Sequence, residues 1–208
     1  MTQHLLREFP PGYGGIERVA HVLASEIGGT VFSFCFFKII DDPLNVTYIR
    51  RELKSFEIGR IYFPFLTTTL FKLLFSNEPL IAHLPCPTIL IVISLARLIR
   101  PKRNIILYWH SFIFPKKTFS GFLESLYQHC ALKIAQYFPV IVTSPILKNK
   151  LLTEGFRKNK IHILSCSLPI EIERLYLRNR KERSNNLTLT GTVIVICRLD
   201  SYKRVDWL

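Results

Sequence analysis

The sequence predicts an α/β protein built on a Rossmann-like, doubly wound parallel sheet. Short apolar runs alternate with helical patterns along most of the chain. The run "NIILYWH" at 104–110 has the composition of a buried strand. A loop with two prolines and three glycines, at 10–15, separates the first apolar run from the first helical pattern. Such a loop is either a tight turn or a means of bringing backbone amides close to an anion.

The first half of the chain provides the first strands and helices. A helix is predicted over 15–28, because Ile16, Val19, Ala20, Leu23 and Ile27 recur at helical spacing and Gly28 and Gly29 can end it. Thr88 is expected to cap the helix over 88–99. Strands are predicted at 3–8, 30–37, 46–51, 60–65 and 80–84, and a further helix at 67–77.

The second half continues the alternation. Strands are predicted at 104–110, 140–145 and 160–166, and helices at 119–137 and 146–155. After residue 169 the chain becomes polar and charged, and the apolar run "TVIVICRL" follows at 192–199. We therefore predict a first domain over 1–170, a crossing segment over 171–191, and over 192–208 the first strand of a second Rossmann-like domain.

The charge of the chain indicates an anionic partner. The 208 residues include 28 Lys and Arg against 15 Asp and Glu, a formal net charge of +13. Basic residues concentrate at 97–103, 148–160 and 178–183. Each cluster is equally consistent with an ordinary solvated face. Because aromatic residues are abundant and no RNA-binding signature is present, the composition favours an anionic membrane surface over nucleic acid.

Several other classes of protein are not supported. No apolar run reaches the roughly 18 residues of a spanning helix, and the N-terminus lacks a secretory signal pattern. The five cysteines are widely spaced and form no CxxC, so neither zinc nor a disulfide framework is indicated. These features predict a cytosolic, reduced protein.

The carboxyl edge of the predicted sheet gathers the candidate site residues, because ligands of such sheets bind there. Gly14 and Gly15 have no side chains, so their amides and the following helix terminus can approach an anion. The spacing is not GxGxxG, and a simple tight turn remains an alternative. His110 ends one strand and can orient a hydroxyl or stabilise developing charge, or it is only a hydrogen-bonded edge residue. The same alternatives hold for His83.

Two cations follow the last predicted strand. Arg198 and Lys203 lie in "CRLDSYKRVD", where they could neutralise the growing charge of a diphosphate leaving group. Solvated basic residues are the alternative. The other histidines, His4, His21, His129 and His162, are predicted to lie on the surfaces of helices or strands.

Several stretches, taken in order, resemble one family. "FPPGYGGIERVAHVLASEI", "HLPCPTILIVISLARL", "ILYWHSF", "VTSPILKNKLL", "KIHILSCSLPIE" and "ICRLDSYKRVDWL" are similar to segments of GT-B fold glycosyltransferases of family 4. The resemblance covers most of the chain and is closest to bacterial enzymes that extend lipopolysaccharide, capsule or exopolysaccharide.

The resemblance implies a retaining transfer of a sugar from a nucleotide diphosphate sugar to a lipid-linked or saccharide acceptor. The matching residues would be His110 as the catalytic histidine and Gly14, Gly15, Arg198 and Lys203 as donor-phosphate ligands, with no metal or other cofactor. We expect the acceptor-side candidates His83, Ser111 and Ser144 at the same edge. The protein would act at the cytoplasmic face of the plasma membrane.

The sequence departs from the family pattern in three places. Phe112 stands where relatives commonly have an acidic residue, and "LSCSLPIE" replaces their Asn-Gly pair. The chain ends at Leu208, before the expected donor-binding domain and its Glu-x7-Glu motif. We therefore expect little transferase activity from this chain alone.

Three other hypotheses stay open. The first is a truncated, non-catalytic module that binds a membrane or a partner. The second is a GT-B enzyme of other chemistry, such as a nucleotide-sugar epimerase, although no acidic residues are expected at the edge. The third and weakest is a basic nucleic-acid binder.

Overall fold

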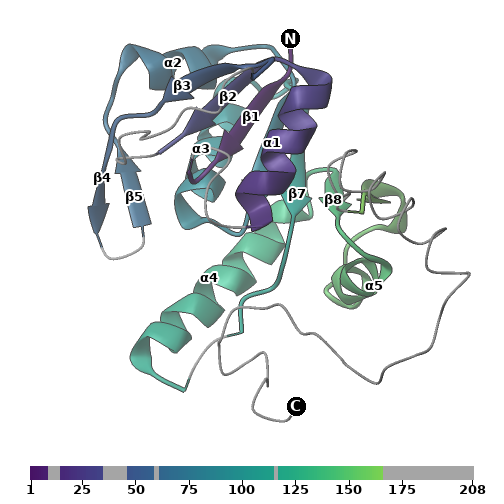
Figure 1. Cartoon of the computed structure of the whole chain (residues 1–208). Coiled ribbons are helices and arrows are strands. Elements are labelled where there is room, and N and C mark those ends of the chain that lie inside the picture. Colours follow the sequence, from purple (N-terminus) through teal and green to yellow (C-terminus); the bar gives the residue numbers. More distant parts are fainter. Residues whose placement is uncertain (9–14, 35–45, 59–60, 115–116, 166–208) are drawn as a thin grey trace, which may run out of the picture. The chain divides into compact units, whose positions relative to one another are not determined.

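The computed structural model describes residues 1–8, 15–34, 46–58, 61–114 and 117–165. Within them lies a sheet of seven strands in the order β3-β2-β1-β6-β7-β8-β9, and every neighbouring pair is parallel (Figure 1). Its strands are β1 (Gln3–Leu6), β2 (Thr30–Ser33), β3 (Ile49–Glu52), β6 (Leu80–Leu84), β7 (Ile105–Trp109), β8 (Val140–Val142) and β9 (Ile161–Ile163). The predicted Rossmann-like, doubly wound sheet is thus confirmed.

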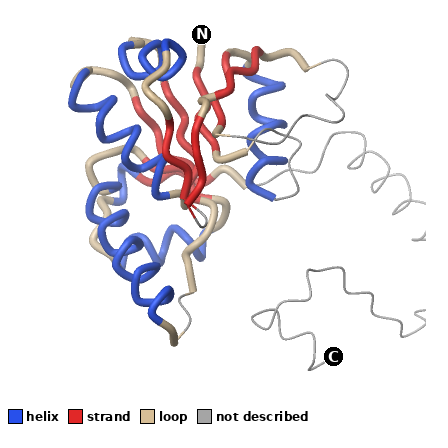
Figure 2. Tube along the Cα trace, turned by 90° about the vertical axis from the view of Figure 1, so that its left-hand side faces the viewer, coloured by secondary structure: helices blue, strands red, loops and turns tan. Residues whose placement is uncertain are grey.

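Five α-helices connect these strands in the described part of the chain. They are α1 (Gly15–Ile27), α2 (Thr68–Phe75), α3 (Pro87–Ile99), α4 (Phe119–Ala135) and α5 (Pro145–Thr153). A short 3₁₀ turn, η1 (Lys158–Lys160), precedes β9. Figure 2 shows that the sheet separates α1 from the larger group of helices.

The core has two parts because both faces of the sheet are covered. The larger part includes Leu5, Ala82 and Leu107 of the central strands with Ile93 of α3 and Leu132 of α4. The smaller part lies beneath α1, where Ala20 and Ala24 pack with Leu6 and Val31. All five residues of β6 are buried, as is typical of a central parallel strand.

The glycines at 28 and 29 end α1 as predicted. Both have positive φ, 74° and 110°. A Cβ atom built on Gly29 would lie 1.9 Å from the carbonyl oxygen of Thr2, so this turn also needs glycine to pass close to the start of β1. Thr30 then donates its amide to the same oxygen at 3.0 Å and begins β2.

Two local predictions are corrected by the structure. Thr88 does not cap α3, because the helix begins one residue earlier, after Cys86. The Thr88 hydroxyl is buried and donates instead to the carbonyl of Tyr62. The strand β4 (Ser55–Ile58) was not predicted; it pairs antiparallel with β5 (Ile61–Pro64), outside the main sheet. Its backbone groups are satisfied by this local hairpin, which an apolar pattern over so few residues does not reveal.

A buried arginine joins the elements at the amino edge of the sheet. Arg103 donates to the carbonyls of Leu73 and Glu78 at 2.6 and 2.8 Å, and to Gln3 Oε1 at 2.6 Å. Burial lowers its pKa to about 10, and the carboxylate of Glu78 opposes this effect. The network lies at the end of the sheet opposite the predicted site and has a structural role.

Candidate functional site

His83 and His110 meet at the carboxyl edge of the sheet. His83 is the fourth residue of β6 and His110 directly follows β7, its neighbour in the sheet. His83 Nδ1 lies 2.9 Å from His110 Nε2, and the two rings stack with their centroids 5.2 Å apart. The predicted grouping of these two histidines at one edge is therefore confirmed, although their catalytic and acceptor-side roles stay predictions.

The same edge contains the point where the strand order reverses. From β1 the chain continues through β2 and β3 on one side, and the later strands extend the sheet from β6 on the other side. In open α/β sheets, ligands bind in the crevice at such a point. The strand β1 ends at this edge, His83 lies on its neighbour β6, and His110 directly follows the next strand, β7.

Both histidines are held in the neutral form at pH 7. Burial lowers the pKa of His110 to about 4. The pKa of His83 lies well below 6.5, mainly because the ring is fully buried and also because His110 and His4 repel a second positive charge. A neutral imidazole can donate a hydrogen bond from one nitrogen and accept one at the other, which suits the orientation of a substrate hydroxyl.

His4 is not the surface residue that the sequence predicted. Its side chain is completely buried in β1, and its ring stacks against His83 with centroids 6.1 Å apart. Within the described part of the chain, neither of its ring nitrogens has a hydrogen-bond partner, and burial lowers its pKa to about 4. The prediction failed because β1 lies in the middle of the sheet, where both faces are covered.

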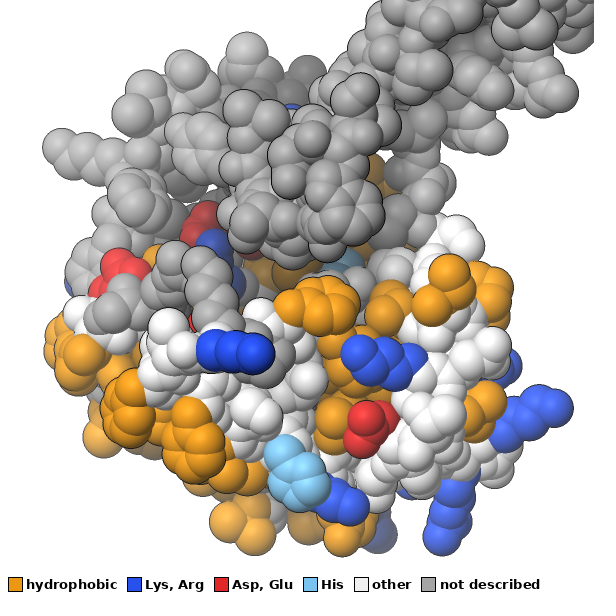
Figure 3. Space-filling view, turned by 90° about the horizontal axis from the view of Figure 1, so that it is seen from below, with side chains coloured by type: hydrophobic (Ala, Val, Ile, Leu, Met, Phe, Trp, Pro, Cys, Tyr) orange, Lys and Arg blue, Asp and Glu red, His pale blue; other side chains and the backbone are white. Residues whose placement is uncertain are grey.

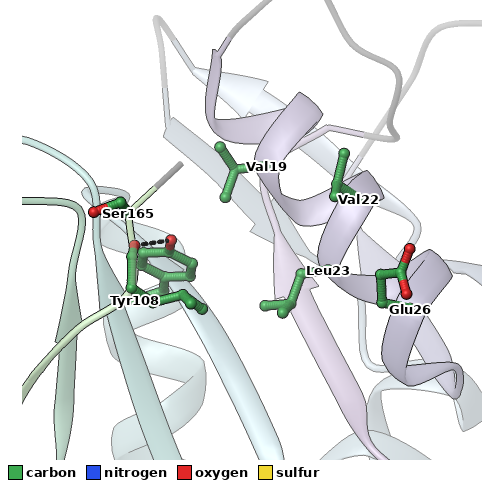
Figure 4. Close-up of a pocket in the computed structure, with 7 residues that line it drawn as sticks. Val19, Val22, Leu23, Glu26, Tyr108 and Ser165 are labelled. Carbon is green, nitrogen blue, oxygen red and sulfur yellow. Dashed lines mark hydrogen bonds between the residues drawn. The ribbon is translucent and has the colours of Figure 1, made fainter. Parts of the chain in front are cut away.

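A small cavity lies beside the histidine pair, on the α1 face of the sheet. Its volume is about 130 Å³, and Val19 and Leu23 of α1 face Tyr108 and Ser165 across it (Figure 4). Glu26 of α1 also belongs to its lining. The Tyr108 hydroxyl donates to the carbonyl of Leu164 at 2.8 Å. The Tyr108 ring also stacks on His110, with centroids 4.3 Å apart. The wall of the cavity is thus continuous with the histidine pair.

One charged residue at this edge was missed by the sequence analysis. Arg7 directly follows β1, its side chain is partly exposed, and it forms an ion pair with Glu8 at 2.5 Å. Burial acts to lower the pKa of Arg7, but the carboxylates of Glu8 and Glu17 outweigh it and raise the pKa. The position of Arg7 directly after the first strand could have placed it at this edge from the sequence.

Other predicted site residues have simpler surroundings. Gly15 is exposed and begins α1, and a Cβ atom added to it would meet nothing within 4 Å. Ser144 caps α5, where its hydroxyl accepts from the amide of Leu147 at 3.3 Å. Ser111 is exposed next to His110. The phosphate role of Gly15 and the acceptor roles of both serines stay predictions.

Phe112, which stands where the resembled family commonly has an acidic residue, is a core residue in the structure. Its side chain is buried and contacts the Trp109 ring, with centroids 5.7 Å apart. The ammonium of Lys150 lies 4.0 Å from the centre of its ring. Phe112 therefore belongs to the core, and not to the surface that surrounds His110.

Gly14, Arg198 and Lys203 lie outside the described residues, as do the predicted segments 171–191 and 192–208. Among the residues that the structure describes, no group of three or more His, Cys, Asp or Glu could hold a metal ion. In the same part of the chain, no helix is long and apolar enough to cross a bilayer. Cys86 and Cys130 are both free.

The fold is similar to solved structures of Anabaena Alr3699/HepE. The complex of that protein with UDP and glucose has a TM-score of 0.60 and 15% identity to this chain, over 89% of this chain and 51% of that one. Its complex with UDP-glucose has a TM-score of 0.58 at 16% identity, and its complex with UDP 0.54 at 17%. Neither a scan of protein-family models nor a search of curated proteins finds a match.

The similarity extends over most of this chain but over only part of the HepE structure. The chain spans about half the length of the HepE structures, and 89% of this chain is included. At this identity the likeness concerns the fold, an α/β Rossmann-like arrangement.

Proposed function

We propose that the chain contributes the acceptor-side half of a GT-B fold glycosyltransferase of family 4. It would take part in the retaining transfer of a sugar from a nucleotide diphosphate sugar to a lipid-linked or saccharide acceptor, in bacterial surface polysaccharide synthesis. The observation that carries the proposal is the pair of neutral histidines at the carboxyl edge, beside the reversal of strand order. The similar fold of HepE, solved with UDP-glucose, supports the choice of donor class.

In this proposal each site residue has a chemical task. His110 orients a sugar hydroxyl or donates to an oxygen that gains charge. Gly14 and Gly15 offer backbone amides to a donor phosphate at the N-terminus of α1. Arg198 and Lys203 neutralise the diphosphate leaving group, and no metal is required. The proposed domain limits remain 1–170, 171–191 and 192–208.

Titration of the ¹⁵N-labelled chain with UDP-glucose tests the proposal. We expect weak binding, with amide and side-chain shifts confined to the carboxyl edge, including Gly15 and His110. His110→Ala should weaken this binding several-fold, while His129→Ala, on the exposed side of α4, should leave it unchanged.

Inorganic pyrophosphate is the necessary comparison, because a chain of charge +13 attracts any polyanion. Equal shifts with pyrophosphate, spread over the basic surface, would contradict a nucleotide-sugar site. So would the absence of any response to UDP-glucose at millimolar concentration.

We also propose that the protein lies at the cytoplasmic face of the plasma membrane. Exposed apolar side chains stand on consecutive helices of the described part, including Phe71, Ile91, Leu98 and Phe122. Exposed Lys72, Arg100, Lys102 and Lys117 lie near them in the chain. Figure 3 shows hydrophobic side chains among Lys and Arg at the surface. Apolar groups and cations together favour an anionic bilayer.

Sedimentation with vesicles tests this location and also the alternative of a non-catalytic membrane-binding module. The chain should bind phosphatidylglycerol-containing vesicles and not pure phosphatidylcholine vesicles. Leu98→Glu should weaken binding, whereas the matched change Asn149→Glu on α5 should have a smaller effect. Binding to neither vesicle would contradict the proposal. Vesicle binding without any nucleotide-sugar binding would favour the non-catalytic module.

A further inference from the structure

Three histidine rings form a row across the central strands, on the α1 side of the sheet. His4 belongs to β1, His83 to β6, and His110 follows β7. Within this row a hydrogen bond joins His83 Nδ1 and His110 Nε2, at 2.9 Å. One of these nitrogens carries the proton and the other accepts it, so the bond links the tautomers of the two rings.

The second ring nitrogen of His83 indicates which of the two histidines donates the shared proton. His83 Nε2 is buried and has no hydrogen-bond partner among the residues that the structure describes. If His110 donated the shared proton, His83 would carry its own proton on Nε2 and leave a buried N–H without an acceptor. If His83 donates, only a lone pair is left unpaired there. Buried N–H groups without partners are rarer in folded proteins than unpaired acceptors.

We propose that His83 is a positioning residue whose Nδ1–H donates to Nε2 of His110 and holds His110 in the Nδ1–H tautomer. The His110 ring cannot turn freely, since it is stacked on Tyr108 at a centroid distance of 4.3 Å and an interplanar angle of 21°. The low pKa values of both rings agree with this arrangement, because a tautomer is defined only for a neutral imidazole.

The consequence is that His110 presents a hydrogen-bond donor, and not a basic lone pair, to whatever binds beside it. Its Nδ1 has no partner among the described residues, and the side chain is only partly buried. Resting on the proposed function, the inference is that this N–H contacts an oxygen of the sugar or of the phosphate. His110 would then orient and stabilise charge and would not remove a proton from the acceptor.

Long-range ¹H–¹⁵N correlation spectra of the histidine side chains test the tautomer directly in the whole chain. We expect His110 to be protonated at Nδ1 over Nε2 by about tenfold or more, the ratio that one buried hydrogen bond can sustain. His83 should be protonated at Nδ1 as well. A wild-type His110 that is protonated mainly at Nε2 would overturn the inference.

Two variants separate positioning from simple structural support. In His83→Phe an aromatic ring is kept at this position but the hydrogen-bond donor is lost. The ratio of the Nδ1–H to the Nε2–H tautomer of His110 should then fall to within about threefold of one, near that of a histidine without such a bond. In His83→Asn the amide nitrogen takes the place of Nδ1 and should restore the preference. His129→Asn is the matched control on an exposed face. An unchanged His110 tautomer in His83→Phe would contradict the proposal.

These outcomes are distinguishable from those of the proposed function. If the tautomer is as expected but UDP-glucose shifts no resonance, the positioning role stands and the transferase assignment fails. If UDP-glucose binds but His110 is protonated at Nε2, the positioning role fails and the proposed function stands. If His83→Phe does not fold, the wild-type and His83→Asn spectra still decide.

Discussion

The row formed by His4, His83 and the partly buried His110 should make the protein sensitive to mild acid. His4 and His110 have pKa values of about 4 in the folded chain, against 6.5 for a free histidine, because burial disfavours their charged forms. Between these two pH values the unfolded chain binds more protons than the folded chain. Stability therefore rises with pH across this window and is lost as the pH falls from 6.5 toward 4.

The size of the effect follows from the pKa values of His4 and His110. From pH 6.5 to pH 4.5, the two histidines together should lower the free energy of unfolding by about 4 kcal/mol, or about 2 kcal/mol each. His83 acts in the same direction, since its pKa is lowered as well. A typical domain has only about 5 to 15 kcal/mol in total, so the loss is large.

Urea unfolding at a series of pH values measures this loss. The fluorescence of Trp109, which is 1% exposed, reports the transition. His4→Leu is the informative variant, because it removes two buried nitrogens that have no partner among the described residues. It should keep or raise stability at pH 7.5 and lose about 2 kcal/mol less than the wild type on acidification. His129→Leu, on the exposed side of α4, is the matched control.

The reasoning would be refuted by a flat profile. If the wild type loses less than about 1 kcal/mol between pH 6.5 and 4.5, the histidines are not buried in their neutral forms. The same conclusion follows if His4→Leu and the wild type lose stability in parallel, because carboxylates elsewhere would then account for the whole effect.

Two further predictions concern the ends of the sheet. Arg103→Met should lower the free energy of unfolding by about 3 to 5 kcal/mol, because two buried acceptors and one partly buried acceptor lose their donor. The exposed Arg100→Met should cost far less, and equal losses in urea unfolding would contradict the network. Gly29→Ala should cost more than about 1 kcal/mol, owing to its φ of 110° and the nearby Thr2 carbonyl. Gly15→Ala should be neutral or slightly stabilising, and a thermal melt that ranks the two glycines in the opposite order would refute this.

Much of the local structure could be predicted from the sequence. Helical spacing and the glycines at 28 and 29 placed α1 and its end, and the apolar runs placed β6 and β7. These features are local, since periodicity and backbone freedom act over a few residues. The hairpin of β4 and β5 was only half found, because a short strand with exposed Phe56 and Ile58 has no burial pattern of its own.

The candidate site was predicted only in outline. The end of a strand is visible in the sequence, so His83 and His110 could be placed at the carboxyl edge of a parallel sheet. That they share a hydrogen bond depends on β6 and β7 being neighbours, which residues far apart in the chain decide together. Arg7 was overlooked for a related reason: Glu8 is its neighbour in the chain, but Glu17, which also raises its pKa, comes near it only when α1 folds back on β1.

The sequence by itself determined the alternation of strands and helices, the ends of several elements and the strong positive charge, because each depends on residue type and short-range spacing. Only the tertiary structure decided that β1 lies in the centre of the sheet, that His4 is buried there, and that the histidines line up across three strands. Strand order and burial are set by the packing of the whole sheet against its helices, and a short stretch of sequence carries no record of its distant neighbours.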